Sequence, residues 1–506
     1  MQGADVVREA AAAALELGLP ETAVEWLEQA RSIVWGDLFQ LRSSYEGLLF
    51  SYPDHAHRLR GLSAALEHAS SIHEKSLSTL SELTPSATRS LEQQADMHRA
   101  LAIERDTLLQ DIRKLPGFER FLLQKDFSQL RASAHSGPVV ILNAAETHCD
   151  ALIILPNVDH VIHVPLPRFS LKQSASLHIA MQGFLRQARA GGPAPSRLNW
   201  NSLLSLLWRS MVKPVLDTLS FSVCDVILLQ FKAHLFIYLE QTPGDLSRIF
   251  WCPTGPLTFL PIHAAGIYDT IRPQPGDKIF DFVVSSYTPS LSILARSANH
   301  STVVGRELRL LAVRQPPSDG ERPLRGVVTK LKSIKEVIKD STCITLVESS
   351  VGTVEEVLGL MKEADWVHFA CHGIQDPTSP TNSGLCLADE RHLKVSDIIT
   401  LSRSRGGLAF LSACQTATGD KELSDEAIHI AAGMLFAGYS GVIGTMWSIS
   451  DRVAPDVARG VYKELFRDGK RPDVREAARA LHEAIKCARD RGEGFDKWVP
   501  FIHVGL

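Results

Sequence analysis

Two short apolar runs in this chain each lead to a side chain that can take part in nucleophilic catalysis. Residues 367–371 lead to His372, and residues 408–412 lead to Cys414. Apolar runs of this length that stop at small or polar residues are typical of buried parallel strands, whose carboxyl ends carry the sites of open α/β sheets. A thiol beside an imidazole ionises more readily, and the thiolate is the attacking species. The pair therefore predicts a cysteine peptidase.

The predicted site gives each residue a role. Cys414 attacks the scissile carbonyl, while His372 takes the thiol proton and returns it to the leaving amine. Gly373 lets substrate backbone approach, so its N–H and that of Cys414 are the expected oxyanion donors. The structural alternative is a buried strand cysteine and a histidine satisfied in a turn, since free cysteine is among the most buried residue types.

His368, Cys371 and His372 are close enough in sequence to suggest a zinc site. In a strand, however, Cys371 faces away from both histidines, and no fourth ligand follows at a suitable spacing. The glycines of residues 438–444 do not form a phosphate-binding loop, because no Gly-Lys-Ser/Thr sequence follows them. We therefore expect no metal and no other cofactor, and we expect Cys371 to lie in the core of the sheet.

Several blocks of the sequence resemble the CHAT family of caspase-like peptidases, which often occur beside TPR repeats and are related to separases. His372-Gly373 and the Ser-Ala-Cys-Gln-Thr sequence at 412–416 resemble the two catalytic blocks of that family. The match runs from roughly residue 137 to the C-terminus, and it implies a caspase-like fold and a cysteine peptidase. The further matching blocks, in chain order, are residues 251–257, 260–266, 286–291 and 437–447, followed by Asp451.

The predicted fold class is α/β, with caspase-like, parallel-rich sheets flanked by helices and preceded by an all-helical region. From residue 138 onward, strand-like runs alternate with helical patterns in two successive series, which indicates right-handed crossovers and parallel sheets in tandem layers. The resemblance implies that residues 136–305 form a degenerate caspase-like half and residues 306–506 the active half. Only the second series carries both His372 and Cys414 at strand ends.

Residues 1–135 are predicted to be helical, as the end of a TPR-like array followed by connecting helices. The TPR resemblance lies in the Ala-x-x-x-Leu-x-x-Gly pattern at residues 11–18. One helix pair cannot bury its own apolar face, so either the chain is cut from a longer protein or these helices pack on the catalytic part. We expect a lone pair to share little core with the rest, so that removing residues 1–43 has a mild effect.

Substrate preference depends on which acid reaches the predicted site. Asp451 follows the strand expected at residues 442–446, and in separases an acidic residue at a comparable place receives an arginine side chain. The resemblance therefore implies a basic P1 residue, the residue before the cleaved bond, because a carboxylate can pair with a guanidinium through two hydrogen bonds. An N-cap for the following helix is an equal interpretation of Asp451. Asp376 and Glu426 are the alternative acids of the pocket.

The composition is that of an ordinary globular protein. The 506 residues are 45% hydrophobic and 22% charged with a net charge of −4, which gives no reason to expect nucleic acid or an anionic membrane as a partner. No stretch approaches the ~20 apolar residues of a membrane span, and the first 20 residues carry charges where a signal peptide has an apolar core. The eight cysteines lack the dense spacing of a disulfide framework. We expect a cytoplasmic protein with reduced cysteines, with the nucleus as the alternative location.

Two classes of function remain open. The first is an active endopeptidase that cleaves protein or peptide substrates and is regulated by an activating protein partner at its helical N-terminal region. The second is a catalytically silent caspase-like scaffold that binds peptides. The intact pair of His372 and Cys414 favours the enzyme.

Overall fold

The computed structural model divides the chain into two compact units. One consists of Met1–Glu28 and Phe127–Leu506, and the other consists of Gln29–Asp126. Two strands that the sequence predicts, at 226–229 and 235–238, lie outside the described residues. The structure describes residues 2–63, 65–66, 85–119, 121–123, 125–189, 197–219, 246–268, 276–298, 307–314, 325–339, 343–349, 352–374, 376, 382–388, 391–401, 407–412, 414–415, 426–449, 452–467, 469 and 471–506.

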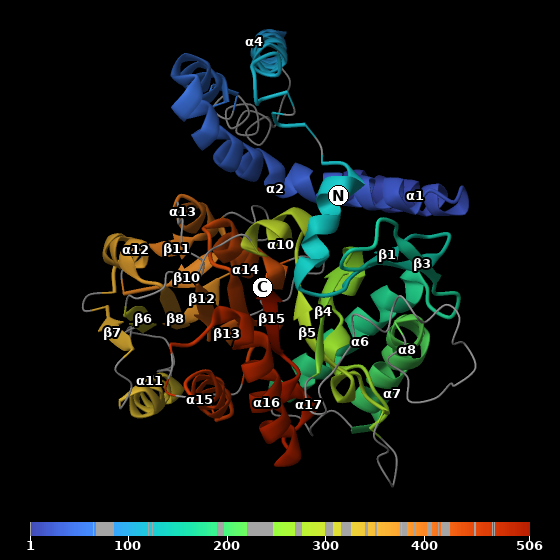
Figure 1. Ribbon diagram of the computed structural model, residues 1–506, viewed down its shortest axis with the longest axis vertical. Coiled ribbons are helices and arrows are strands. Elements are labelled where there is room, and N and C mark those ends of the chain that lie inside the picture. The colour runs from blue at the N-terminus through green and yellow to red at the C-terminus, as the bar shows by residue number, and fades with distance from the viewer. Residues whose placement is uncertain are drawn as a thin grey trace. The chain divides into compact units, whose positions relative to one another are not determined.

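In the described part of the larger unit, eleven strands form one sheet (Figure 1). Most neighbouring strands are parallel, and the antiparallel pairs are β1 with β2, β2 with β3, and β14 with β15. The predicted α/β class, with a mostly parallel sheet flanked by helices, is confirmed. In order across the sheet the strands are β3 (Ile162–Pro165), β2 (Cys149–Ile154), β1 (Val139–Ala144), β4 (Ser247–Pro253), β5 (Val283–Tyr287), β15 (Phe501–Gly505), β14 (Gly441–Thr445), β12 (Leu408–Leu411), β8 (Trp366–Ala370), β6 (Leu308–Arg314) and β7 (Ile344–Glu348).

Helices cover both faces of this sheet, which explains why its central strands are buried throughout their length. Over the second half, α11, α15 and α16 lie on one side and α12, α13 and α14 on the other (Figure 1). None of the helices in the described part of the chain is long and apolar enough to cross a membrane. The main helices of this unit are α1 (Gln2–Glu16), the start of α2 (Pro20–Ser51), α5 (Phe127–Leu130), α6 (Leu171–Arg189), α7 (Arg197–Leu207), α8 (Lys213–Thr218), α10 (Leu291–Ala298), α11 (Arg325–Ile338), α12 (Val354–Glu363), α13 (Val395–Ile399), α14 (Glu426–Phe436), α15 (Ala454–Leu465), α16 (Ala477–Asp490) and α17 (Phe495–Trp498).

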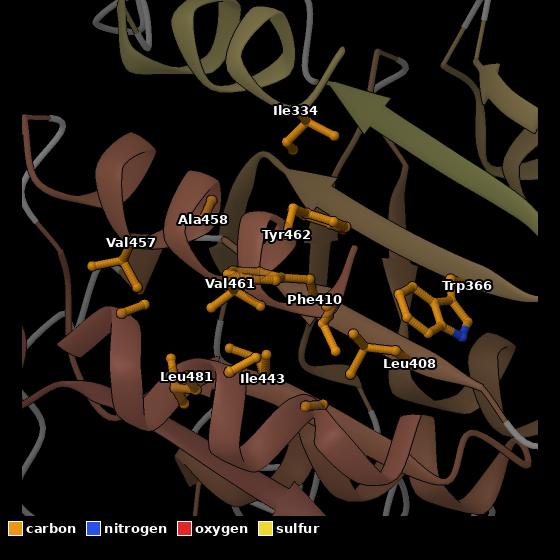
Figure 2. Packing of buried hydrophobic residues seen from close by; sticks show 14 of the residues in the cluster. Ile334, Trp366, Leu408, Phe410, Ile443, Val457, Ala458, Val461, Tyr462 and Leu481 are labelled. Carbon is orange, nitrogen blue, oxygen red and sulfur yellow. The ribbon is translucent and has the colours of Figure 1, made fainter. Parts of the chain in front are cut away.

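The core of the second half lies between the sheet and α15 (Figure 2). Val457, Val461 and Tyr462 recur at helical spacing, so they form one apolar stripe on α15. This stripe packs in one buried cluster with Phe410 of β12 and Ile443 of β14. Each side chain of this size contributes about 1.5–3 kcal/mol by leaving water. The cluster therefore fixes the strands that lead to the predicted site.

His368 belongs to this core. It is fully buried, its Nδ1 lies 3.1 Å from the hydroxyl of Tyr462, and its ring stacks on Phe410 with the centroids 4.6 Å apart. Cys371 is also fully buried, as the sequence predicts. His372, in contrast, lies in a second, smaller sheet. Of the three residues considered for zinc, His368 thus lies in the main sheet, His372 in the second sheet, and Cys371 at the bend between them.

The N-terminal helix pair packs on the first half of the sheet. Buried side chains of α1 and α2, such as Leu15 and Leu27, share one apolar cluster with Ile141 of β1, Ile154 of β2 and Phe250 of β4. The structure shows that these helices pack on the α/β part of the chain, which is one of the two alternatives that the sequence leaves open. The expectation that the pair shares little core is wrong, because the apolar periodicity of a helix does not say which surface covers it. The TPR-like assignment itself stays a prediction.

Four glutamates of this helix pair also bind backbone N–H groups of the same unit. Each carboxylate accepts from an amide that lies more than a hundred residues further along the chain, so none of these contacts can be found from local sequence patterns. The contacts are Glu9 with Glu146 (2.6 Å), Glu21 with Val161 (2.9 Å), Glu25 with Phe127 (2.7 Å), and Glu28 with Leu291 and Ser292 (3.0 and 2.9 Å).

The C-terminal strand β15 joins the two halves of the sheet. Five of its residues pair antiparallel with β14, and on its other edge Val504 pairs with Tyr287 of β5. The two series of strands therefore form one continuous sheet, joined edge to edge, rather than two separate layers. No predicted strand corresponds to β15, because a run of five residues is too short to give a clear periodic signal.

A half-buried arginine of the first half holds β15 in place. Arg248 of β4 donates to the hydroxyl of Ser286 (2.9 Å) and to the carbonyl oxygen of Gly505 (3.1 Å), and its Nη2 lies 3.1 Å from Nδ1 of His503. Burial, and then the charge of Arg248, lower the pKa of His503 well below its usual value. The imidazole is therefore neutral and can accept this hydrogen bond.

The second unit is helical, as predicted. It contains most of α2 together with α4 (Pro85–Ile112). Leu48, Leu59, Ile112 and Phe121 are buried in its apolar cluster, so the unit has a small core of its own. The domain boundaries expected after residues 135 and 305 stay predictions.

Candidate active site

The two apolar runs of the predicted site each continue beyond the main sheet into a second sheet of four strands. After β8 the chain bends at Cys371 and resumes as β9, and after β12 it resumes as β13. Just before this change, the N–H of Ser412 donates to the carbonyl oxygen of Phe369 (2.9 Å). In order, the strands of the second sheet are β11 (His392–Lys394), β10 (Gly384–Cys386), β9 (His372–Ile374) and β13 (Cys414–Gln415).

The pairing of β9 with β13 brings together the residues that the sequence predicts as base and nucleophile. The two strands are parallel, and Cys414 is the register partner of His372, while Gln415 is the partner of Gly373. Neighbouring strands of a sheet lie about 4.8 Å apart, so the two backbones are adjacent at this point. For Cys414 the structure describes the backbone and not the side chain. Both residues lie past the carboxyl edge of the main sheet, on the strand extensions rather than at the edge itself.

The hairpin of β10 and β11 supports β9 from its other side. Leu385 of β10 is the register partner of Gly373, and Leu385 and Leu393 are fully buried. Gly384 lies so close to β11 that a Cβ atom there would be 2.4 Å from the carbonyl oxygen of Leu393. A side chain at Gly384 would therefore separate the strands, which makes the glycine necessary for this hairpin.

The acids predicted for a substrate pocket are only partly described. Asp376 follows β9, is half-buried, and donates its backbone N–H to the hydroxyl of Ser383 (3.0 Å), which closes the connection to β10. Glu426 is the first residue of α14, and its side chain is not described. Asp451 lies outside the described residues. The structure thus places Asp376 four residues after His372 on the same segment.

The strands that lead to the site could be predicted from the sequence, but the second sheet could not. Its strands have two or three residues each, which is too short for an alternating pattern to be visible. Gly384 is the one local signal that could have indicated a close approach of two strands.

Comparison with known proteins agrees with this architecture. The separase of Saccharomyces cerevisiae, solved in complex with securin, superposes with a TM-score of 0.51 at 11% sequence identity over 96% of this chain. This chain spans 37% of that separase chain. The pro- and mature domains of Porphyromonas gingivalis RgpB give a TM-score of 0.33 at 11% identity, covering 59% of this chain and 76% of that one. A comparison with curated protein sequences gives no match.

The separase match shows a shared fold. The sequence model of the CHAT domain matches residues 201–506, which is more than half of the 506 residues. The chain therefore belongs to the CHAT domain family. The matched segment includes both strands of the candidate site and the C-terminal strand β15.

Proposed function

We propose that this protein is a cysteine endopeptidase in which Cys414 is the nucleophile and His372 the general base. The observation that carries the proposal is the parallel pairing of β9 with β13, in which these two residues are register partners. Membership of the CHAT family and the caspase-like fold support the same chemistry. A reduced Cys414 fits the cytoplasmic location that we expect.

The proposed reaction has two stages. The imidazole of His372 takes the proton of the Cys414 thiol, and the thiolate attacks the scissile carbonyl. The N–H groups of Gly373 and Cys414 stabilise the oxyanion. His372 then gives its proton to the leaving amine, and water hydrolyses the thioester in the second stage. No metal or other cofactor takes part in these steps.

A peptide that carries an acyloxymethyl ketone tests the nucleophile directly. We expect it to alkylate Cys414 and to leave Cys414→Ala unlabelled, as read by peptide mass spectrometry. Cys487 is an exposed thiol on α16, so Cys487→Ala is the matched control and should label as the wild type does. Labelling that needs a thiol other than Cys414, or no labelling at all, would favour the catalytically silent scaffold.

We further propose a basic P1 preference, with Asp451 as the acid that pairs with the substrate side chain. The placement of Asp376, half-buried on the segment that follows His372, makes it the alternative acid, and Glu426 at the start of α14 is the third. A carboxylate at the bottom of a closed pocket discriminates strongly because it is left unpaired when the substrate carries no cation.

The expected result is a change in the ratio of kcat/KM values for matched peptides with Arg and Leu at P1. Asp451→Asn should lower this ratio about tenfold or more, because Asn cannot form the charged pair. The N-cap position of α15 belongs to Val453, so the interpretation of Asp451 as the N-cap of this helix is wrong. If Asp451 lies outside the pocket, the ratio stays unchanged. Asp376→Asn is the matched control, and a lowered ratio in that variant would assign the pocket to Asp376.

We also propose that a protein partner regulates the enzyme through its helical N-terminal region. The yeast separase, whose fold this chain shares, was solved with a protein partner, securin. In this chain, α2 runs without interruption from the sheet-packed segment that ends at Glu28 into the helical unit Gln29–Asp126. A partner that binds the helical unit would therefore act on a helix that contacts the catalytic part.

A further inference from the structure

A buried carboxylate of α2 holds the first turn of α10. Glu28 is only 6% exposed. One of its oxygens accepts from the hydroxyl of Ser290 and the N–H of Ser292, both at 2.9 Å, and the other accepts from the N–H of Leu291 at 3.0 Å. The first N–H groups of a helix have no partner within the helix, and a negative charge beside them is stabilising. Glu28 thus satisfies the start of α10 from a distant part of the chain.

The last turn of α10 holds the end of another helix. Arg296 donates through Nη2 to the carbonyl oxygens of Leu435 (2.9 Å) and Phe436 (3.2 Å). These are the last two residues of α14, where carbonyl groups have no partner within the helix. A cation at this end is favourable for the same electrostatic reason that an anion is favourable at the start. The short helix α10 is therefore fixed at one end by Glu28 and itself fixes α14.

The helix α14 packs beside the strands that lead to Cys414. It is apolar and buried over residues 430–436, and it contacts α13 and β14. The strand β14 is the parallel neighbour of β12, which leads to β13 and Cys414. Arg296 therefore holds the end of a helix on which the position of these strands depends.

We propose that Glu28 and Arg296 are positioning residues for the peptidase: through α10 they hold α14, and through α14 they hold the strands β14 and β12 that lead to Cys414. This inference rests on the proposed function. It also identifies where the proposed partner could act on the peptidase, because α2 carries Glu28 and continues into the helical unit to which that partner would bind. Displacement of α2 removes the cap of α10 and releases α14.

The test compares Glu28→Gln and Arg296→Gln with Glu21→Gln. Glu21 is the matched control, because it lies on the same helix and its carboxylate also accepts one backbone N–H, that of Val161, far from α10. Two quantities are measured in the full chain: hydrogen exchange of the amides of α14, and kcat and KM for a cleaved peptide. Thermal unfolding shows that each variant is folded, and Arg296→Lys, which keeps the charge, should restore part of the loss.

We expect Glu28→Gln and Arg296→Gln to speed exchange in α14 and to lower kcat about tenfold with KM within about twofold, because a small misplacement of the nucleophile affects the chemical step. The double variant should be little worse than either single one, since both act through α10. Glu21→Gln should leave both quantities unchanged. Unaltered exchange in α14, or an equal loss in Glu21→Gln, would overturn the inference. Exchange is measurable without catalysis, so this failure is distinct from failure of the proposed function, which would appear as full activity of Cys414→Ala.

Discussion

Replacing Cys414 by Ala should lower kcat/KM by at least about a thousandfold, and replacing His372 by Ala should do the same. The reason is that each variant removes one member of a unit that works only as a pair: without the thiol no acyl-enzyme forms, and without the imidazole the thiol stays protonated. The double variant should therefore be no worse than either single one. Steady-state kinetics on one peptide, with circular dichroism to confirm folding, measures both effects.

The matched control for this prediction is Cys371→Ala. Cys371 is fully buried beside the site in sequence, so its loss should cost on the order of 1 kcal/mol of stability and leave kcat nearly unchanged. Thermal unfolding separates that effect from a chemical one. Loss of activity in Cys371→Ala together with full activity in Cys414→Ala would contradict the assignment of the nucleophile.

Ending the chain after residue 500 should abolish folding of the larger unit. The removed strand β15 pairs with β14 on one edge and with β5 on the other, so the truncation opens the sheet at its centre. It also deletes the fully buried side chains of Phe501 and Val504 and leaves Arg248 without two of its partners. Each lost feature costs several kcal/mol, so the summed loss exceeds the total stability of about 5–15 kcal/mol that is typical of a domain. The soluble fraction after expression and the presence of a cooperative thermal transition measure this effect.

Two further variants serve as comparisons for the truncated chain. Val504→Ala in the full chain should unfold cooperatively but cost about 2 kcal/mol, because it removes packing and keeps the strand pairing. A chain that starts at Leu308 keeps β15 but removes its neighbour β5, and it should also be poorly soluble. A soluble and cooperatively folded chain that ends at residue 500 would show that the two halves do not need β15.

The sequence was sufficient to find the residues of the candidate site and the strands that lead to them. The runs that became β8 and β12 are apolar and end at polar residues, which are local properties of neighbouring residues. The burial of Cys371 was also predicted, although the structure places this residue at the bend between β8 and β9 rather than within a strand. The helical character of the N-terminal region could be predicted for the same reason, since helical periodicity is written within each segment.

Only the tertiary structure decided which of these segments meet. The partner of β9 is β13, 42 residues further along, and the register that sets Cys414 opposite His372 depends on the packing of both runs on the sheet. The role of β15 as the join between two halves depends on β5, which lies more than 200 residues before it. The contacts of Glu28 with α10 span 262 to 264 residues. A carboxylate accepts hydrogen bonds, so a glutamate in the sequence indicates that some donor will bind it. Which backbone amide that donor is depends on the folded chain.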